Sequence, residues 1–371
     1  MSRSVAFLVT HLMGAGHLVR TLALARATSD LGAAAGVRVR VISGGRPLAH
    51  VAADGVELVQ LPPVASDGVD YARLLDLDGR PATEALLAAR RRAAAEAVAQ
   101  ARPDALVTET WPFGRRRLSG EFEAAVEAAG GARLWASIRD VLEPPSKPGR
   151  VAETRARLRG FAGVLVHGDA AAIPLEESWP GPAGGARPEP PPGVVYTGYV
   201  SAPAPAPSAS DEVLVAVGGG VIGRRLLELA ARASALSARP WRLRVGGADA
   251  AEAARRLSRL GPARVEPAAA DYRARLAGAA ASISLCGYNT AVETALSGTP
   301  ALLVPMEEGG EQEQLIRARG FARLPGIETA RIGTLTPEGL AQTAERLAAR
   351  PRRPVALRAD GAAAAARALL E

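Results

Sequence analysis

Two halves of the chain begin in the same way, on either side of a stretch that forms no regular element. This stretch, residues 201–211, reads SAPAPAPSASD, and its alternating prolines lack the N–H groups that a β-ladder needs. On each side, an apolar run is followed by a glycine turn and then by apolar residues at helical spacing. That succession opens doubly wound α/β domains. The sequence predicts domains over 1–200 and 212–371, joined by an Ala/Pro linker over 201–211.

Short apolar runs mark the expected strands of both domains. The predicted strands are 4–10, 37–43, 56–61, 105–108, 134–138, 164–167, 194–197, 213–217, 241–245, 281–285 and 301–305. Helical spacing predicts helices over 18–31, 82–101, 221–235, 250–260, 289–297 and 337–349. Strands that alternate with helices form parallel sheets. We therefore expect two sheets that face a central cleft, where small molecules usually bind.

Composition excludes several classes of protein. The single cysteine, Cys286, rules out a disulfide framework and a cysteine-based zinc site. No run of about 18 apolar residues exists, and the N-terminus lacks the layout of a signal peptide. The sequence therefore predicts a cytoplasmic protein.

The net charge is +7, and nearly all of the positive charge is arginine, since Lys147 is the one lysine. This surplus fits an anionic ligand or contact with a membrane surface, but no basic block indicates nucleic-acid binding.

The first glycine turn carries a histidine at the start of a predicted helix, in the sequence Gly14-Ala15-Gly16-His17. The glycines allow positive φ, and a histidine there could take a proton from a hydroxyl near neutral pH. A tight turn with a capping histidine is the alternative. The dinucleotide pattern GxGxxG fails because Val19 replaces its last glycine. Arg46 could still meet an NADP phosphate, so an oxidoreductase remains open.

Three patterns in the second half suit a nucleotide sugar. Gly218, Gly219 and Gly220 precede a predicted helix, where backbone amides and the helix dipole attract anions. Cys286-Gly287-Tyr288-Asn289-Thr290 forms a second glycine turn, and Glu293 lies one helical turn further on, where its carboxylate could accept from a ribose diol. Glu311 and Gln312 stand in a polar run that suits sugar hydroxyls. Plain turns, a capping box and a solvated acidic loop are the structural alternatives.

Taken together, these residues resemble the two-domain GT-B glycosyltransferases, in particular glycosyltransferase family 28. The resemblance is closest from Gly287 to Glu293 and from Gly298 to Pro305, and Gly14–His17 is similar to that family's Gly-Gly-His turn with one glycine replaced by Ala15. Other stretches resemble a bacterial group of predicted glycosyltransferases: TETWPFGR (108–115), SIRD (137–140), VHGD (166–169) and YTGYV (196–200).

The resemblance implies a role for each candidate residue. His17 would be the general base on the acceptor hydroxyl, with Gly14, Gly16 and Glu109 in loops on the acceptor side. The donor nucleotide would lie against two glycine turns and Glu293, and its base, uracil by preference, against backbone at 265–270. Glu311 and Gln312 would hold the donor sugar. The residues implied for the nucleotide are Gly218, Gly219, Gly220, Gly287, Tyr288, Asn289, Thr290 and Glu293.

The expected activity is therefore inverting, metal-independent transfer of a sugar from a nucleoside diphosphate, with UDP favoured, to a hydroxyl of a small molecule or glycoconjugate. No cofactor or metal site is expected. Asp76-Leu77-Asp78 imitates a metal-binding DxD pattern, but it stands in a predicted loop without a partner ligand. A GT-B epimerase, a pseudo-transferase, a non-catalytic sugar-nucleotide binder and the NADP oxidoreductase remain as alternatives.

Overall fold

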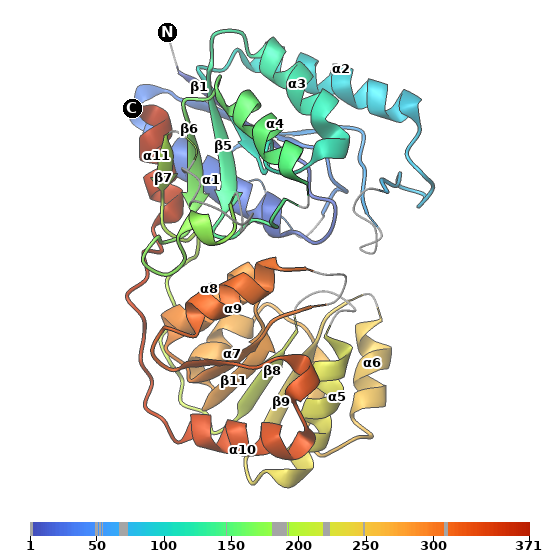
Figure 1. Ribbon diagram of the computed structural model, residues 1–371, viewed down its shortest axis with the longest axis vertical. Coiled ribbons are helices and arrows are strands. Elements are labelled where there is room, and N and C mark those ends of the chain that lie inside the picture. Colours follow the sequence, from blue (N-terminus) through green and yellow to red (C-terminus); the bar gives the residue numbers. More distant parts are fainter. Residues whose placement is uncertain are drawn as a thin grey trace. The chain divides into compact units, whose positions relative to one another are not determined.

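The chain folds into two α/β units, which Figure 1 shows in the order of the sequence. The computed structural model describes residues 3–48, 51, 53, 55–66, 73–145, 147–179, 191, 193–217, 223–247, 249–307 and 311–371. Unit 1 comprises Met1–Ala170, Pro174–Val200 and Arg358–Glu371, and unit 2 comprises Ala171–Ile173 and Ser201–Leu357. Each unit is built on one parallel sheet.

Unit 1 has a seven-stranded sheet in the order β3-β2-β1-β4-β5-β6-β7. Its strands are β1 Ser4–Val9, β2 Arg38–Ser43, β3 Glu57–Gln60, β4 Ala105–Glu109, β5 Arg133–Arg139, β6 Gly163–His167 and β7 Val194–Tyr196. Its helices are α1 Gly16–Gly32, α2 Glu84–Ala101, α3 Ser119–Ala128, α4 Pro148–Leu158 and α11 Gly361–Leu370. Short 3-10 turns lie at Ala33–Ala35, Arg116–Leu118 and Leu175–Glu177.

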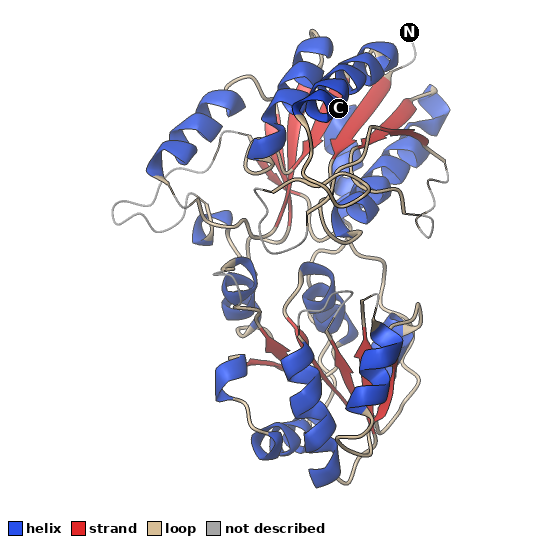
Figure 2. Cartoon of the chain, turned by 90° about the vertical axis from the view of Figure 1, so that its right-hand side faces the viewer, coloured by secondary structure: helices blue, strands red, loops and turns tan. Residues whose placement is uncertain are grey.

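Side chains alternate between the two faces of the sheet along each strand, and helices cover both faces of its central strands. Phe7 of β1 faces a core shared with α1 and α11, whereas Ala6 and Leu8 face a core shared with α2 and α3. Figure 2 shows the resulting layers, with helices on either side of the strands. Strands that are buried on both faces have continuous apolar sequences, and this is why they could be predicted from the sequence.

Unit 2 has a six-stranded sheet in the order β10-β9-β8-β11-β12-β13. Its strands are β8 Val213–Ala216, β9 Trp241–Val245, β10 Arg264–Pro267, β11 Ala281–Leu285, β12 Ala301–Val304 and β13 Ile327–Thr329. Its helices are α5 Arg224–Ala233, α6 Ala250–Leu257, α7 Tyr272–Gly278, α8 Tyr288–Ser297, α9 Glu313–Phe321 and α10 Pro337–Ala348, with 3-10 turns at Ser234–Leu236 and Ile332–Thr334. The expected α/β class with two doubly wound parallel sheets is confirmed.

The Ala/Pro stretch contains no helix or strand between Ser201 and Ser210, and it lies along unit 2. Arg273 of α7 donates to the carbonyls of Ala202 and Pro203 at 2.5 and 2.6 Å. A Cβ on Gly278 would stand 2.3 Å from the Ser208 carbonyl oxygen, so the close approach of the stretch depends on this glycine. Among the helices that the structure describes, none combines the length and the apolar character that a membrane span requires.

The last helix departs from the predicted domain boundaries. The sequence analysis assigned all of 212–371 to the second domain, but Arg358–Glu371 belongs to unit 1. Helix α11 packs on α1, and the two ribbons lie side by side in Figure 1. This contact buries Ala365, Ala366 and Leu369. An apolar stripe on a terminal helix does not encode which sheet it will cover, and this is why the pattern alone misplaced it.

We predict that Leu369→Ala lowers the free energy of unfolding of unit 1 by about 2–5 kcal/mol, because it empties a site that is 1% exposed. The measurement is denaturant unfolding followed by tryptophan fluorescence in a Trp241→Phe background. Trp111, Trp135 and Trp179 then report unit 1 alone. Leu31→Ala, at a 54% exposed site of α1, is the control and should change the stability by under about 0.5 kcal/mol. Equal effects of the two substitutions would contradict the docking of α11.

Candidate active site

The site in unit 1 lies where the sheet changes direction. After β1 the chain continues toward β2, and after β4 it continues toward β5 on the opposite side. Such a switch point, at the carboxyl ends of the strands, is where open α/β sheets bind ligands. The turn after β1 has Gly14 at φ +54° and enters α1 at Gly16, where a Cβ would meet no heavy atom within 4 Å. Gly14 is therefore required by the backbone, while Gly16 leaves open space.

His17 and Glu109 meet across this switch point. His17 is the second residue of α1, and Glu109 is the last residue of β4. The His17 Nδ1 atom lies 2.8 Å from Glu109 Oε1, with 15% of the histidine side chain and 3% of the glutamate side chain exposed. The sequence analysis had both residues as candidates but did not pair them. Adjacent strands bring them together, although 92 residues separate them in the chain.

Arg20 completes a charged group around the Glu109 carboxylate. It lies one turn after His17 on α1, donates to Glu109 Oε1 and is 5% exposed. Burial alone would raise the pKa of Glu109, but Arg20 and the hydrogen bonds from His17 and Ser137 hold it well below its usual range. Glu109 is therefore a carboxylate at neutral pH, and both of its oxygens can only accept hydrogen bonds.

The Glu109 carboxylate determines which ring nitrogen of His17 carries the proton. Burial lowers the pKa of His17 to about 3, against the opposing hydrogen bond with Glu109, and Arg115, Arg139 and Arg20 lower it further. The imidazole is neutral at neutral pH, and its one proton must lie on Nδ1 because Glu109 can only accept. The Nε2 atom then carries a lone pair. A neutral histidine held in this tautomer can accept a proton from a hydroxyl.

The residue after Glu109 has a rare backbone conformation. Thr110 lies at φ +69°, a region that β-branched residues seldom adopt. Its hydroxyl lies 3.4 Å from His17 Nδ1 and 3.5 Å from Glu109 Oε1, and its N–H donates to the Ser137 carbonyl at 2.7 Å. A Cβ on Gly114 would lie 2.8 Å from the Thr110 methyl group, so this glycine lets the loop fold over Thr110. Backbone strain of this kind collects at functional sites.

In unit 2, α8 begins directly after the second glycine turn. Gly287 precedes the helix in an extended conformation, and no side chain caps the first turn. The first-turn N–H groups of Tyr288, Asn289 and Thr290 lack intrahelical acceptors, and they lie at the positive end of the helix dipole. The Asn289 side chain is exposed and Thr290 is half-buried. Tyr288 is 5% exposed, so its ring offers little surface to a ligand at this end.

Arg317 of α9 fixes the turn before α8. Its guanidinium is fully buried, donates to the Cys286 carbonyl at 3.2 Å and pairs with Glu313 at 2.9 Å. It also lies 5.8 Å from the centre of the Tyr288 ring, in cation–π contact. The orientation of the α8 start is thus set by a buried arginine that the sequence analysis did not single out.

Glu293 lies in a small pocket of unit 2 beside the Ala/Pro stretch. The pocket is lined by Ala204, Pro205, Arg273, Leu276, Glu293, Leu296 and Ser297. The carboxylate lies 3.4 Å from Arg273 Nε and is 21% exposed. Burial raises the pKa of Glu293, and Arg273 opposes that shift. The side chain is therefore accessible from one side, with one cation already beside it.

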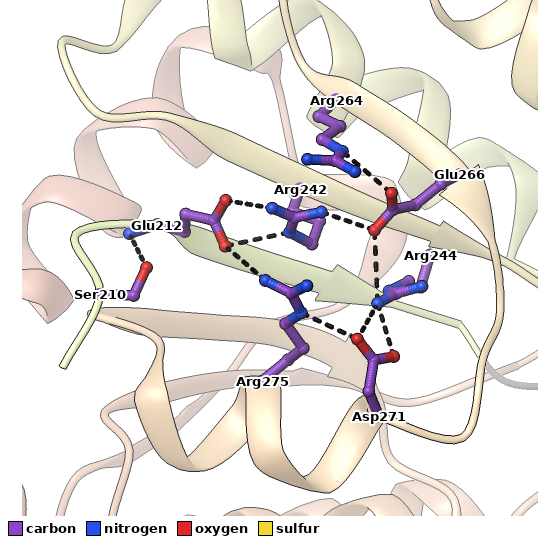
Figure 3. Close-up of polar contacts among 8 residues, drawn as sticks. All are labelled: Ser210, Glu212, Arg242, Arg244, Arg264, Glu266, Asp271 and Arg275. Atoms are coloured by element: carbon purple, nitrogen blue, oxygen red, sulfur yellow. Dashed lines mark hydrogen bonds and ion pairs between the residues drawn. The ribbon is translucent and has the colours of Figure 1, made fainter. Parts of the chain in front are cut away.

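The backbone at 265–270, expected near the base, is anchored by arginines of β9. Arg244 donates to the Pro267 carbonyl at 3.2 Å and grips both oxygens of Asp271 at 2.6 and 2.8 Å. The Ala268 N–H bonds to the Val245 carbonyl, whereas Ala269 and Ala270 are exposed. Figure 3 shows the guanidinium of Arg244 between the carboxylates of Glu266 and Asp271, which lie on either side of this short loop.

The same network continues along the sheet, as Figure 3 shows. Arg242 takes both oxygens of Glu212 at 3.0 and 2.6 Å and reaches Glu266 at 2.6 Å. Arg264 donates to Glu266 at 2.9 Å, and Arg275 donates to Asp271 at 2.9 Å. Bidentate arginine–carboxylate pairs fix direction as well as distance. The sequence analysis missed this cluster because its members are separated along the chain.

The remaining candidates divide into described and undescribed positions. Glu311 and Gln312 lie directly before α9, with Glu311 half-buried and Gln312 exposed at the position that precedes the helix. Gly218, Gly219 and Gly220 fall outside the described residues. Asp76 accepts from the backbone N–H groups of Asp78 and Arg80 at 2.9 and 2.8 Å, so the DxD pattern forms a turn. No group of three or more metal-ligating side chains occurs in the part of the chain that the structure describes.

Comparison with known proteins gives partial sequence matches. No protein-family model matches the chain. A stretch of 92 residues is 36% identical to a transferase of Brucella anthropi that is named UDP-N-acetylglucosamine–N-acetylmuramyl-(pentapeptide) pyrophosphoryl-undecaprenol N-acetylglucosamine transferase. A stretch of 97 residues is 37% identical to the protein of the same name from Rhodopseudomonas palustris. These matches cover 25% and 26% of this chain and 24% and 26% of the relatives, so the chain spans about a quarter of the length of the curated relatives it matches.

Solved structures match nearly the whole chain. MurG of Acinetobacter baumannii aligns with a TM-score of 0.58 at 16% identity, over 98% of this chain and 95% of that one. Phytolacca americana UGT2, solved with UDP-2-fluoro-glucose and pterostilbene, aligns with a TM-score of 0.61 at 16% identity, over 100% and 94%. Glycosyltransferase VinC, solved with dTDP, aligns with a TM-score of 0.54 at 18% identity, over 99% and 95%. The chain therefore has the GT-B fold, and over about a quarter of its length it is similar in sequence to N-acetylglucosaminyltransferases of glycosyltransferase family 28.

Proposed function

We propose that this protein is an inverting glycosyltransferase that moves a sugar from a nucleoside diphosphate, UDP by preference, to a hydroxyl of a small-molecule or glycoconjugate acceptor. The observation that carries the proposal is the pairing of a neutral His17 with the Glu109 carboxylate at the switch point of a GT-B domain. The partial relatives are named as transferases of this class, which supports the proposal.

In the proposed reaction, His17 Nε2 takes the proton of the acceptor hydroxyl. The acceptor oxygen then forms a bond to the anomeric carbon, on the face opposite to the diphosphate. The bond between that carbon and the diphosphate oxygen breaks, and the nucleoside diphosphate leaves with the electron pair. One displacement of this kind inverts the anomeric centre. The imidazolium that forms is stabilised by Glu109, which lies 2.8 Å from Nδ1.

Unit 2 would hold the donor through backbone and carboxylate groups. The amides at the start of α8 would meet the diphosphate, since helix N-termini attract anions without a metal. Glu293 would accept from the ribose hydroxyls, and Ala269 and Ala270 would present exposed backbone groups to the base. Glu311 and Gln312 would contact the sugar, and Gly218, Gly219 and Gly220 would add amides to the diphosphate site. We propose a cytoplasmic location and no metal requirement.

The first prediction concerns ligand binding. UDP or dTDP at about 100 times its dissociation constant should add about 2.7 kcal/mol to the free energy of unfolding, with or without magnesium. Thermal denaturation with UDP, dTDP, GDP, ADP and NADP checks this. Stabilisation by NADP alone would contradict the proposal, and stabilisation by UDP that requires magnesium would contradict its metal-independent form.

A second prediction tests the ribose assignment. Glu293→Gln should weaken UDP binding by about tenfold or more, because a charged acceptor of two hydrogen bonds is lost. The same substitution should have much less effect on 2′,3′-dideoxy-UDP, which lacks the two hydroxyls. Glu328→Gln is the matched control, since Glu328 is a similarly half-buried carboxylate paired with arginine in the same unit. Calorimetry gives the dissociation constant of each protein for each nucleotide, and an equal loss for both nucleotides would refute the assignment.

A third prediction tests whether His17 is neutral in the folded protein. A histidine whose folded pKa is about 3 binds its proton only in the unfolded chain between about pH 6.5 and 3. Stability is therefore complete above pH 6.5 and falls below it, by about 1.4 kcal/mol per pH unit for each such residue. His17→Gln should reduce the slope of the unfolding free energy against pH by about 1.4 kcal/mol per pH unit below pH 6.5. The unfolding free energy at pH 8 serves as the reference for each protein. Identical slopes would mean that His17 titrates normally.

A further inference from the structure

Three polar residues that the proposed reaction does not use lie buried beside Glu109. Ser137, His167 and Thr197 are 1%, 0% and 0% exposed. They belong to three of the stretches that resemble predicted glycosyltransferases, SIRD, VHGD and YTGYV. Buried polar groups are costly unless they are hydrogen-bonded, so their partners show what holds them there.

The three residues continue the His17–Glu109 pair across the sheet. Ser137 donates to Glu109 Oε2 at 2.5 Å, and its hydroxyl lies 3.0 Å from His167 Nε2. His167 Nδ1 lies 2.9 Å from the Thr197 hydroxyl. Glu109 and His167 end β4 and β6, Ser137 lies two residues before the end of β5, and Thr197 directly follows β7. These strands are neighbours in that order. A line of hydrogen bonds therefore runs along the carboxyl edge of the sheet, one residue per strand.

The position of each hydrogen in this line follows from the chemistry of Glu109. A carboxylate can only accept, so the single hydroxyl proton of Ser137 points to Glu109 Oε2. The Ser137 oxygen must then accept from His167, which places a proton on His167 Nε2. Burial lowers the pKa of His167 to about 3, so the ring is neutral and Nδ1 has no proton. Thr197 must therefore donate to Nδ1.

The alternative orientation of the Thr197 hydroxyl would interrupt this line of hydrogen bonds. The Thr197 hydroxyl also lies 2.9 Å from the Gly198 carbonyl and 3.2 Å from the Val166 carbonyl. If it donated there, His167 Nδ1 would carry the proton and Nε2 would need the Ser137 proton. Ser137 and Glu109 would then face each other at 2.5 Å with no hydrogen between two oxygen lone pairs. That contact is repulsive, so the first orientation is favoured.

We propose that Ser137, His167 and Thr197 are positioning residues that fix the Glu109 carboxylate and, through it, the Nδ1–H tautomer of His17. The two histidines are then held in opposite tautomers, with the proton on Nδ1 of His17 and on Nε2 of His167. The catalytic consequence rests on the proposed role of His17 as the base, but the tautomers do not.

The primary test is ¹H–¹⁵N NMR of the full chain with labelled histidine, which reports the protonated ring nitrogen of each residue. The chain has four histidines, and His17→Gln and His167→Gln assign the two signals of interest. We expect opposite neutral tautomers at pH 7. Ser137→Ala should remove the partner of His167 Nε2–H and turn the His17 signal into a mixture of tautomers. A proton on His167 Nδ1, or a His17 signal unaffected by Ser137→Ala, would overturn the proposal.

Ser43→Ala provides the matched control. Ser43 is 1% exposed and ends β2 at the same edge of the sheet, and its buried hydroxyl has no hydrogen-bond partner among the described residues. The control should leave the His17 signal unchanged, and a change equal to that of Ser137→Ala would refute the proposal. An unshifted His11 signal confirms that each variant is folded. His167→Gln keeps a donor near the position of Nε2 and should preserve the His17 tautomer better than His167→Leu.

Kinetic measurements distinguish a failure of this proposal from a failure of the proposed function. Ser137→Ala should lower kcat by about tenfold or more in the wild-type background and less than about twofold in a His17→Ala background, because its effect passes through His17. Equal losses in both backgrounds would show a purely structural role and overturn the proposal. If no nucleotide sugar is turned over, the proposed function fails while the NMR outcome still decides the tautomers.

Discussion

The candidate active site of unit 1 depends on the contacts that hold the buried carboxylate of Glu109. A charge at this depth is stable only when its partners compensate it, and Arg20, His17 and Ser137 all donate to its two oxygens. Arg20 supplies the compensating charge, and burial lowers the pKa of His17, which leaves the ring neutral. The sheet supplies the placement, since β1 and β4 are neighbours at the switch point. The Glu109 carboxylate can only accept, and this sets the tautomer of the neighbouring histidine.

Unit 2 uses arginine for a different purpose. Arg244 and Arg317 each bind a carboxylate and a backbone carbonyl, so each fixes the course of a loop at the end of a strand. The forked, permanently charged guanidinium is suited to holding two acceptors at once. These two arginines therefore serve the fold of unit 2.

Sequence reasoning identified what depends on local pattern. Apolar runs gave the central strands, and the two glycine turns gave the starts of α1 and α8. It did not identify the edge strands β10 and β13, whose sequences RVEP and IET have no apolar run. Nor did it place α11, whose partner is far away in the chain. The roles of Ser137, His167 and Thr197 depend on the order of strands in the sheet, which no local spacing encodes.

The interaction between Glu109 and His17 is tested most directly by Glu109→Gln, which keeps the shape of the side chain and removes its charge. The measurement is kcat from nucleoside diphosphate release, together with the dissociation constant of the donor. We predict that kcat falls by about 10²–10⁴-fold, because the base loses its orienting carboxylate, while the donor constant changes less than about twofold. An unchanged kcat, or an equal loss in kcat and donor affinity, would contradict the central role of Glu109.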